Sequence, residues 1–310
     1  MNKIKIGIPK ALLFYHYGDL WTHFFEELGC DIIISPNTNQ EILDYGNKFS
    51  VDEACLAMKI YMGHIHYLLD KCDYILVPRI ICLKKNEKLC TNFSALYDLV
   101  RNTFQKRIIH YNIDVGKKED EAYAFTTMGL ELGFSYRKII KAYKIAKEKE
   151  KIMFERRLSR QKAMIANSKG LKILIASHPY NLYDDFIGKP IIRLLEENHA
   201  QIIYSDLYDE KYLEQDVSEI SKRNYWTYNK KIMASIHHYQ DNVDGIILIT
   251  AFPCGPDSLS NEMILRKVKI PIINIVVDDS KAEAGLITRI ESFIDILEER
   301  KGKHYEQENH

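Results

Sequence analysis

Six cysteines are the residues of this chain that are best suited to chemistry: Cys30, Cys55, Cys72, Cys82, Cys90 and Cys254. They form no close C-x-x-C pair, so the sequence indicates neither a dense disulfide framework nor a four-ligand structural zinc site. In a reducing compartment, such thiols serve as metal ligands, as nucleophiles or as small buried side chains. The strands and helices around each thiol help to separate these roles.

Strand-like and helix-like segments alternate along the chain. Short β-branched runs occur at KIKIGIP, CDIIISP, CDYILVP and RIIHYNI, and again at LKILIAS, AQIIYSD, GIILITAF and IPIINIVVD. This alternation predicts an α/β fold with two doubly wound parallel-sheet lobes of Rossmann or flavodoxin type, joined by a helical segment. We predict a first lobe over residues 1–114, a helical connecting segment over 115–170, a second lobe over 171–300 and a polar tail over 301–310.

The positions of the cysteines relative to the predicted strands sort them into two groups. Cys30 and Cys72 stand just before strands, whereas Cys254 and Cys90 lie beyond strand ends. Open α/β sheets bind ligands outside the carboxyl ends of their strands. We therefore expect Cys30 and Cys72 to be buried structural residues. Cys82 also lies past a strand end and is a reserve ligand.

Cys55 enters through the segment that follows CDIIISP. The S-x-x-E pattern of Ser50 and Glu53 predicts a helix that opens at Ser50, with Cys55 one turn inside it on the inward stripe. Three thiols from separate segments fit an iron–sulfur cluster with one iron open or capped by another ligand. In the alternative, Cys55 is a core residue, Cys90 a loop thiol and Cys254 part of a tight turn.

Two loops beyond strand ends carry further chemical groups. In FPCGPDS, Gly255 would allow close backbone approach or a positive φ beside Cys254, and the following helix would offer N–H groups to an anion. The same features suit a nucleophilic Cys254. In HPYNLYDD, His178, Tyr180 and Asn181 are candidate catalytic residues, with His178 as acid, base or donor to a substrate carbonyl.

Composition and motifs exclude several functions. Lys plus Arg and Asp plus Glu number 43 each, so charge indicates no nucleic-acid or anionic-membrane partner. The chain shows no signal-peptide or membrane-spanning pattern, and we expect a cytoplasmic protein. It contains neither G-x-x-x-x-G-K-[ST] nor G-x-G-x-x-G, so the sequence predicts no P-loop ATPase and no classical dinucleotide site.

In chain order, the motifs KIGIPKALLFYHYG, DEAC, LC, ASHPYNLYDDF and FPCGPDS resemble those of the acyl-CoA dehydratase activase-related proteins. These belong to the 2-hydroxyacyl-CoA dehydratase superfamily, which includes the double-cubane cluster proteins. The resemblance extends to about Arg300. It implies two α/β lobes and an oxygen-sensitive iron–sulfur cluster, most simply 4Fe-4S, held by Cys55, Cys90 and Cys254.

The resemblance also implies an anaerobic role in electron transfer. In relatives that are dehydratases, a separate ATP-dependent iron–sulfur activase supplies a low-potential electron for radical dehydration, and other relatives reduce small molecules. The chain would thus be a dehydratase-like lyase or an iron–sulfur reductase component acting on a small molecule such as an acyl-CoA. Its partners would be the activase and a second copy or a dehydratase-like subunit.

Two alternatives stay open beside this interpretation. One is a non-catalytic electron carrier or assembly partner of a dehydratase system, and the other is an enzyme that uses Cys254 as a nucleophile. Two departures from the family pattern also bear on the role: Thr91 stands where Pro is expected after the cysteine, and the additional helical domain of dehydratase subunits is missing from the predicted elements.

Overall fold

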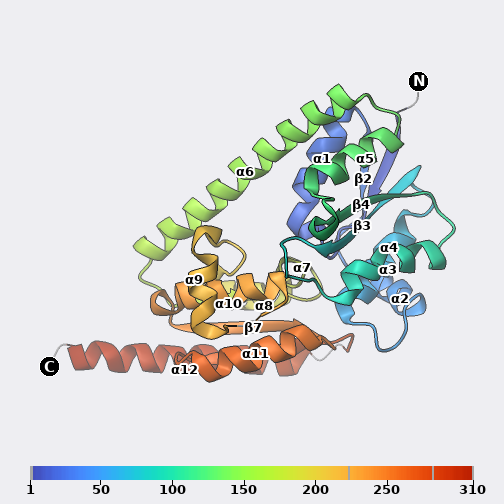
Figure 1. Ribbon diagram of the computed structural model, residues 1–310. Helices are drawn as coiled ribbons and strands as arrows, with labels where there is room; N and C mark the ends of the chain where they lie inside the picture. The colour runs from blue at the N-terminus through green and yellow to red at the C-terminus, as the bar shows by residue number, and fades with distance from the viewer. Residues whose placement is uncertain (1–2, 223, 281–282, 309–310) are drawn as a thin grey trace. The chain divides into compact units, whose positions relative to one another are not determined.

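The structure is a computed structural model that describes residues 3–222, 224–280 and 283–308, and its chain divides into two compact units (Figure 1). The first unit comprises Met1–Glu155 with Tyr225–Thr227, and the second comprises Arg156–Asn224 with Tyr228–His310. Each unit contains a four-stranded parallel sheet. The α/β prediction with two doubly wound lobes is confirmed.

The sheet of the first unit contains the four strands that the β-branched runs predict. They are β1 (Lys5–Ile8), β2 (Asp31–Ile34), β3 (Tyr74–Cys82) and β4 (Ile108–Asp114). All neighbours pair in parallel, in the order β2-β1-β3-β4. The strand that follows β1 in sequence, β2, lies on one side of it, whereas β3 and β4 lie on the other side. A topological switch point therefore lies between the carboxyl ends of β1 and β3.

Helices cover both faces of this first sheet (Figure 1). One face carries α1 (Phe14–Leu28) and α5 (Glu121–Glu131), and the other carries α3 (Leu56–Leu68) and α4 (Thr91–Thr103). An aromatic cluster fills the space between α1, α5 and the sheet, with ring centroids 4.6 to 5.4 Å apart, and consists of Trp21, Phe24, Tyr111 and Phe125. Burial of this cluster fixes the sheet that positions the carboxyl-end loops.

The helix α2 (Gln40–Lys48), which the sequence analysis missed, packs against α3 through a reciprocal glycine contact. A Cβ on Gly63 of α3 would lie 1.9 Å from the Ile42 carbonyl oxygen of α2. A Cβ on Gly46 of α2 would lie 2.0 Å from the Lys59 carbonyl oxygen of α3. The two backbones therefore approach as closely as only glycine permits.

A buried histidine joins α3 to the carboxyl end of β2. The His64 side chain is fully buried, with Nδ1 2.8 Å from Ser35 Oγ and Nε2 3.1 Å from Thr38 Oγ1. Burial, with the charge of Lys10 adding to it, lowers the pKa of His64 to about 3. The ring is consequently neutral in the folded protein over the physiological range.

This histidine makes stability depend on pH in a defined window. Between the unfolded pKa of about 6.5 and the folded pKa of about 3, only the unfolded chain binds the proton, so stability falls as pH falls, by about 1.4 kcal/mol per unit. We expect His64→Gln, which cannot titrate, to flatten this part of the curve in denaturation experiments followed by tryptophan fluorescence. The partly exposed His23→Gln of the same unit is the control, and equal slopes for wild type and His64→Gln would contradict the assignment.

The second unit repeats the same topology. Its strands β5 (Lys172–Ala176), β6 (Gln201–Tyr204), β7 (Gly245–Ala251) and β8 (Ile272–Val277) pair in parallel in the order β6-β5-β7-β8. The switch point therefore lies between β5 and β7. His178 follows the carboxyl end of β5 in the sequence, and Cys254 follows the carboxyl end of β7.

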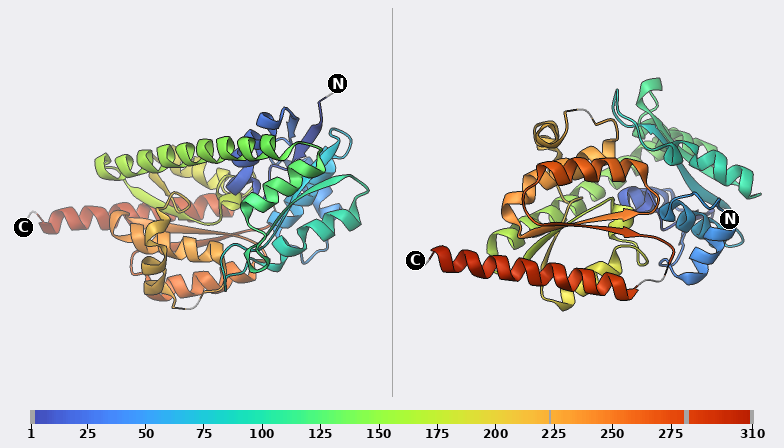
Figure 2. Two further views of the ribbon diagram at one scale, coloured as in Figure 1. Left: turned by 45° about the horizontal axis from the view of Figure 1, so that its top comes forward. Right: turned by 90° about the horizontal axis from the view of Figure 1, so that it is seen from below.

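Within the second unit, helices again lie on both faces of the sheet (Figure 2). One face carries α8 (Lys189–Glu197) and α12 (Glu283–Glu308), and the other carries α9 (Leu213–Ile220), α10 (Thr227–Tyr239) and α11 (Gly255–Lys267). The apolar side chains between α9 to α11 and the sheet form a continuous core that includes Leu174, Met233 and Ile264. The helix α12 continues into the predicted polar tail, of which residues 309–310 lie outside the described residues.

The long helix α6 (Tyr136–Asn167) lies within the predicted connecting segment and contributes to both units. In the second unit its Gln161 is buried against β6, where Oε1 accepts from the Tyr204 N–H at 2.8 Å and Nε2 donates to the Tyr204 carbonyl at 3.1 Å. A side-chain amide thus continues the hydrogen bonding of an edge strand. Among the described residues, no helix is both long and apolar enough to cross a lipid bilayer.

Candidate functional site

The three cysteines that the family resemblance singles out share one local environment: each is the residue that precedes a helix. Cys55 is the N-cap of α3, Cys90 of α4 and Cys254 of α11. All three side chains are half-buried. The unsatisfied N–H groups of a helix N-terminus carry a partial positive charge, which is favourable for an anionic group bound at such a position.

The position of Cys55 corrects the sequence interpretation. The helix does not open at Ser50, because residues 51–54 form a turn in which the Ala54 N–H bonds to the Val51 carbonyl at 3.0 Å. The helix begins at Leu56, so Cys55 is its N-cap and does not lie one turn inside the helix. The capping signature of Ser50 and Glu53 was therefore a misleading signal, and the true start makes the thiol more accessible than predicted.

Cys55 of the first unit lies against the first turn of α4, the helix that Cys90 precedes. The Asn92 side-chain amide, in the first turn of α4, donates to Cys55 Sγ at 3.6 Å, and Cys90 is the N-cap of that same helix. Thr91, where the family pattern has Pro, is the first residue of α4. Proline is favoured at this position but is not required there, so threonine preserves the placement of the Cys90 thiol.

Cys254 follows β7 directly in the second unit, as expected for a thiol at a carboxyl end. Gly255 is the first residue of α11, and the predicted positive φ is wrong, because its φ is not positive. An added Cβ would meet no heavy atom of the chain within 4 Å, and the close approach of this backbone to a cluster sulfide stays a prediction. The folded chain itself does not need a glycine here. The position of a Cβ on Gly255, the residue after Cys254, is open space.

The other three cysteines differ. Cys30 and Cys72 are buried at the amino ends of β2 and β3, as predicted. Burial raises the pKa of the Cys30 thiol to about 11 and also raises the pKa of Cys72. Both groups are therefore unsuited to thiolate chemistry. Cys82 is the last residue of β3, and its thiol donates to the Lys84 carbonyl at 2.9 Å.

Beside Cys254, the second unit contains a buried polar cluster that joins two strand ends. The loop after β5 contains a short helix, α7 (Pro179–Leu182), and His178 is the N-cap of this helix. His178 Nε2 lies 2.8 Å from Asp257 Oδ1. The Asn229 side-chain amide of α10 donates to the same oxygen at 2.8 Å. All three side chains are buried.

Asp257 is the centre of this cluster. Burial alone would raise the pKa of its carboxyl, but the attraction and hydrogen bond of His178, with hydrogen bonds from Asn229 and Cys254, hold that pKa below its usual value. The carboxylate is thus ionised and accepts bonds from its neighbours. It lies 2.8 Å from His178 Nε2 and also has a hydrogen bond with the Cys254 thiol.

The remaining predicted residues adjoin His178. The Tyr180 ring stacks on the His178 ring with centroids 4.8 Å apart and planes 10° apart. Asn181 is fully buried, and its Nδ2 donates to Ser177 Oγ at 3.0 Å. The structure therefore brings His178, Tyr180 and Asn181 together at the β5 carboxyl end, within the same unit as Cys254.

Sequence reasoning missed two members of this cluster. Asp257 could have been found, because it stands three residues after Cys254, where the first turn of a helix favours an acidic side chain. Asn229 gives no local signal, since its role depends on the packing of α10 against α11. Both came from tertiary structure.

The thiols fit an iron–sulfur group by their chemistry. Thiolates at helix N-termini are the ligands and the environment that an anionic cluster prefers, and Cys55 and Cys90 share one such environment in the first unit. Over the described residues, no group of three or more His, Cys, Asp or Glu side chains is arranged to hold a metal ion. The three thiols therefore match a cluster in the type of donor atom, whereas the described side chains are not assembled around a metal position.

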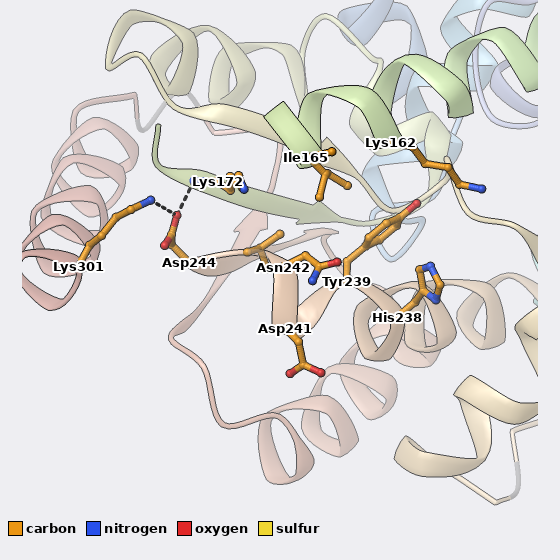
Figure 3. Close-up of a pocket in the computed structure, with 11 residues that line it drawn as sticks. Lys162, Ile165, Lys172, His238, Tyr239, Asp241, Asn242, Asp244 and Lys301 are labelled. Atoms are coloured by element: carbon orange, nitrogen blue, oxygen red, sulfur yellow. Dashed lines mark hydrogen bonds and ion pairs between the residues drawn. The ribbon is translucent and has the colours of Figure 1, made fainter. Parts of the chain in front are cut away.

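A pocket of about 630 Å³ lies at the opposite end of the second sheet, near the amino ends of β5 and β7 (Figure 3). Lys301 and Asp244 form an ion pair of 3.0 Å at its wall, as the dashed line shows. His238, also in the wall, faces Asp216 at 3.4 Å. Lys301, Asp244 and His238 thus each have a partner within the chain.

Comparison with known proteins gives a family match. Residues 5–207 match the family described as CoA enzyme activase uncharacterised domain (DUF2229), a stretch that includes Cys55, Cys90 and His178 and ends before Cys254. The comparison with curated proteins finds no match. Among solved structures, the C-terminal domain of glucosamine-fructose-6-phosphate aminotransferase from Francisella tularensis aligns with 94% of this chain and 82% of its own, at 12% identity. Its TM-score of 0.22 carries no argument.

Proposed function

Because the chain belongs to the CoA enzyme activase uncharacterised-domain family, we propose that it is an iron–sulfur component of a CoA-enzyme system. In this proposal it takes a low-potential electron from a separate ATP-dependent activase and uses it in the dehydration or reduction of a small molecule. The proposed ligands are Cys55 and Cys90 of the first unit and Cys254 of the second. A bound 4Fe-4S cluster would supply one-electron chemistry.

One observation carries this proposal: the three proposed ligands, and neither of the buried cysteines, stand at helix N-caps. The N–H groups of α3, α4 and α11 stabilise negative charge on Cys55, Cys90 and Cys254. Cys30 and Cys72 instead lie at amino ends of strands, where burial raises the thiol pKa. The chain thus keeps thiolate-favouring and thiolate-opposing sites apart.

Residues of the second unit would handle the substrate. His178, Tyr180 and Asn181 lie at the switch point of the second sheet, where open α/β sheets bind ligands. Asp257 orients the His178 ring, and the Tyr180 ring supports one of its faces. A nucleophilic role for Cys254 has less support, because the group bonded to its thiol is a carboxylate of lowered pKa and so a weak base.

The test is the iron and acid-labile sulfide content of the chain, produced with ample iron and purified without oxygen. We expect several irons per chain, and we expect Cys55→Ala, Cys90→Ala or Cys254→Ala to lower that content strongly because each removes a ligand. Cys30→Ala and Cys72→Ala are the matched controls and should retain the wild-type content.

Two results would count against the ligand set. Iron-free wild-type protein under these conditions would remove the proposal, whereas loss of iron in Cys82→Ala with retention in Cys90→Ala would move one ligand to Cys82. A catalyst and an electron carrier would both bind the cluster. They differ in whether a small molecule also binds beside His178 and Asn181.

A further inference from the structure

Two buried atoms at the switch point of the second sheet have no hydrogen-bond partner among the described residues. They are Nδ1 of His178 and Oδ1 of Asn181, whose side chains are 4% and 0% exposed. The two residues are three apart along α7 and its cap, so they lie on the same side of one helical turn. A buried polar atom without a partner costs about 1 to 3 kcal/mol, so two neighbouring ones indicate that a ligand completes them.

The hydrogen bonds around His178 decide which nitrogen carries the proton. Asp257 Oδ1 is an acceptor that also receives the Asn229 amide, so His178 Nε2 must donate to it. In the neutral form of the ring, which is the form that would bind the ligand proposed below, the other nitrogen then has a lone pair. Nδ1 is therefore an acceptor, and the expectation that His178 donates to a substrate carbonyl is not favoured.

A second chain of bonds decides the orientation of the Asn181 amide. Ser177 Oγ donates to the Ile249 carbonyl of β7, which leaves Oγ to accept from the amide of Asn181. The Asn181 nitrogen is accordingly directed at Ser177, and its carbonyl oxygen is the atom without a partner. Like His178 Nδ1, this atom can only accept.

We infer that His178 Nδ1 and Asn181 Oδ1 form an acceptor pair that binds the N–H or O–H groups of a neutral ligand, with a carboxamide as the simplest match. Asp257 and Ser177 are positioning residues, because each fixes the acceptor character of its neighbour. An anionic or purely accepting group would face two lone pairs and be repelled. This inference extends the proposed function by naming the chemistry that the substrate presents to the second unit.

The test uses two probes of nearly equal shape, acetamide, which donates hydrogen bonds, and acetate, which does not. The full chain is labelled with ¹⁵N in its histidines and studied by NMR at mildly alkaline pH. We expect His178 to show a protonated Nε2 and an unprotonated Nδ1. Acetamide should shift the Nδ1 resonance in a saturable way and bind about tenfold more tightly than acetate, while the exposed His199 serves as internal reference.

A variant separates positioning from mere structure. Asp257→Asn removes the charged acceptor, so His178 should show a mixture of both ring tautomers and weaker acetamide binding. Asp241→Asn, on the exposed surface, should leave both unchanged. If Asp257→Asn does not fold, as judged by circular dichroism, the wild-type tautomer and probe measurements still decide the inference.

Three outcomes would overturn the inference: a ring protonated on both nitrogens, a proton on Nδ1 alone, or tighter binding of acetate than of acetamide. Absence of any saturable shift at Nδ1 would overturn it as well. Iron content is measured in the same samples. The probe experiment can therefore contradict the acceptor pair in a chain that binds iron, or support it in a chain that lacks iron. The two proposals are judged separately.

Discussion

Gly63→Ala is expected to lower the free energy of unfolding of the first unit by about 3 kcal/mol or more. The new methyl group would lie 1.9 Å from the Ile42 carbonyl oxygen, and a backbone atom cannot move aside as a flexible side chain can. Helices α2 and α3 must separate, and Cys55 at the start of α3 moves with them. Denaturation followed by tryptophan fluorescence measures this unit, because Trp21 and Trp226 both belong to it.

The chain offers a matched control for this change. Gly302 is also helical, in α12, but an added Cβ would meet nothing within 4 Å. Because Gly302 belongs to the second unit, its variant is followed by circular dichroism. Gly302→Ala should leave stability unchanged or raise it by up to about 1 kcal/mol, since alanine is the better helix former. Equal effects of the two substitutions would show that the α2 and α3 contact is looser than the structure has it.

Asp257→Ala is expected to destabilise the second unit by about 3 kcal/mol. The substitution removes a buried carboxylate and leaves the N–H groups of His178 and Asn229 without their acceptor among buried side chains. Hydrogen exchange followed by mass spectrometry should show faster exchange in β7 and α11. We expect the same peptides to remain protected in Asp257→Asn, which keeps an acceptor oxygen.

Asp241→Ala is the control for the loss of an acidic side chain, because Asp241 is exposed. Its effect should stay within about 0.5 kcal/mol. A small effect of Asp257→Ala, comparable to that of the control, would mean that the cluster does not hold the ends of β5 and β7 together.

The strands of this fold were predictable because their signal is local. All eight lie in β-branched runs, and burial on both faces of a parallel sheet selects such runs. The start of α3 was not predictable, since Ser50 with Glu53 mimics a cap and the turn at residues 51–54 has no comparable signature. The helix α2 was missed because QEILDYGNK is short and polar.

The candidate site was predictable in its parts but not in its connections. The sequence places Cys254 and His178 after strands, and the topology brings those strands side by side. It does not indicate that Asp257 lies between them or that His178 accepts through Nδ1, because both depend on contacts between distant segments. The chemical character of the site came from these bonds.

The Gln161 contact also bears on how the edge strand β6 can pair with other strands. An edge strand with open N–H and C=O groups is a template for strands of other molecules, and such pairing leads to aggregation. On β6 the Gln161 amide occupies both backbone groups of Tyr204, and on β8 the Arg289 guanidinium occupies the Asn274 carbonyl. On each edge of the second sheet, one long polar side chain thus occupies backbone groups that a strand of another molecule would otherwise need for pairing.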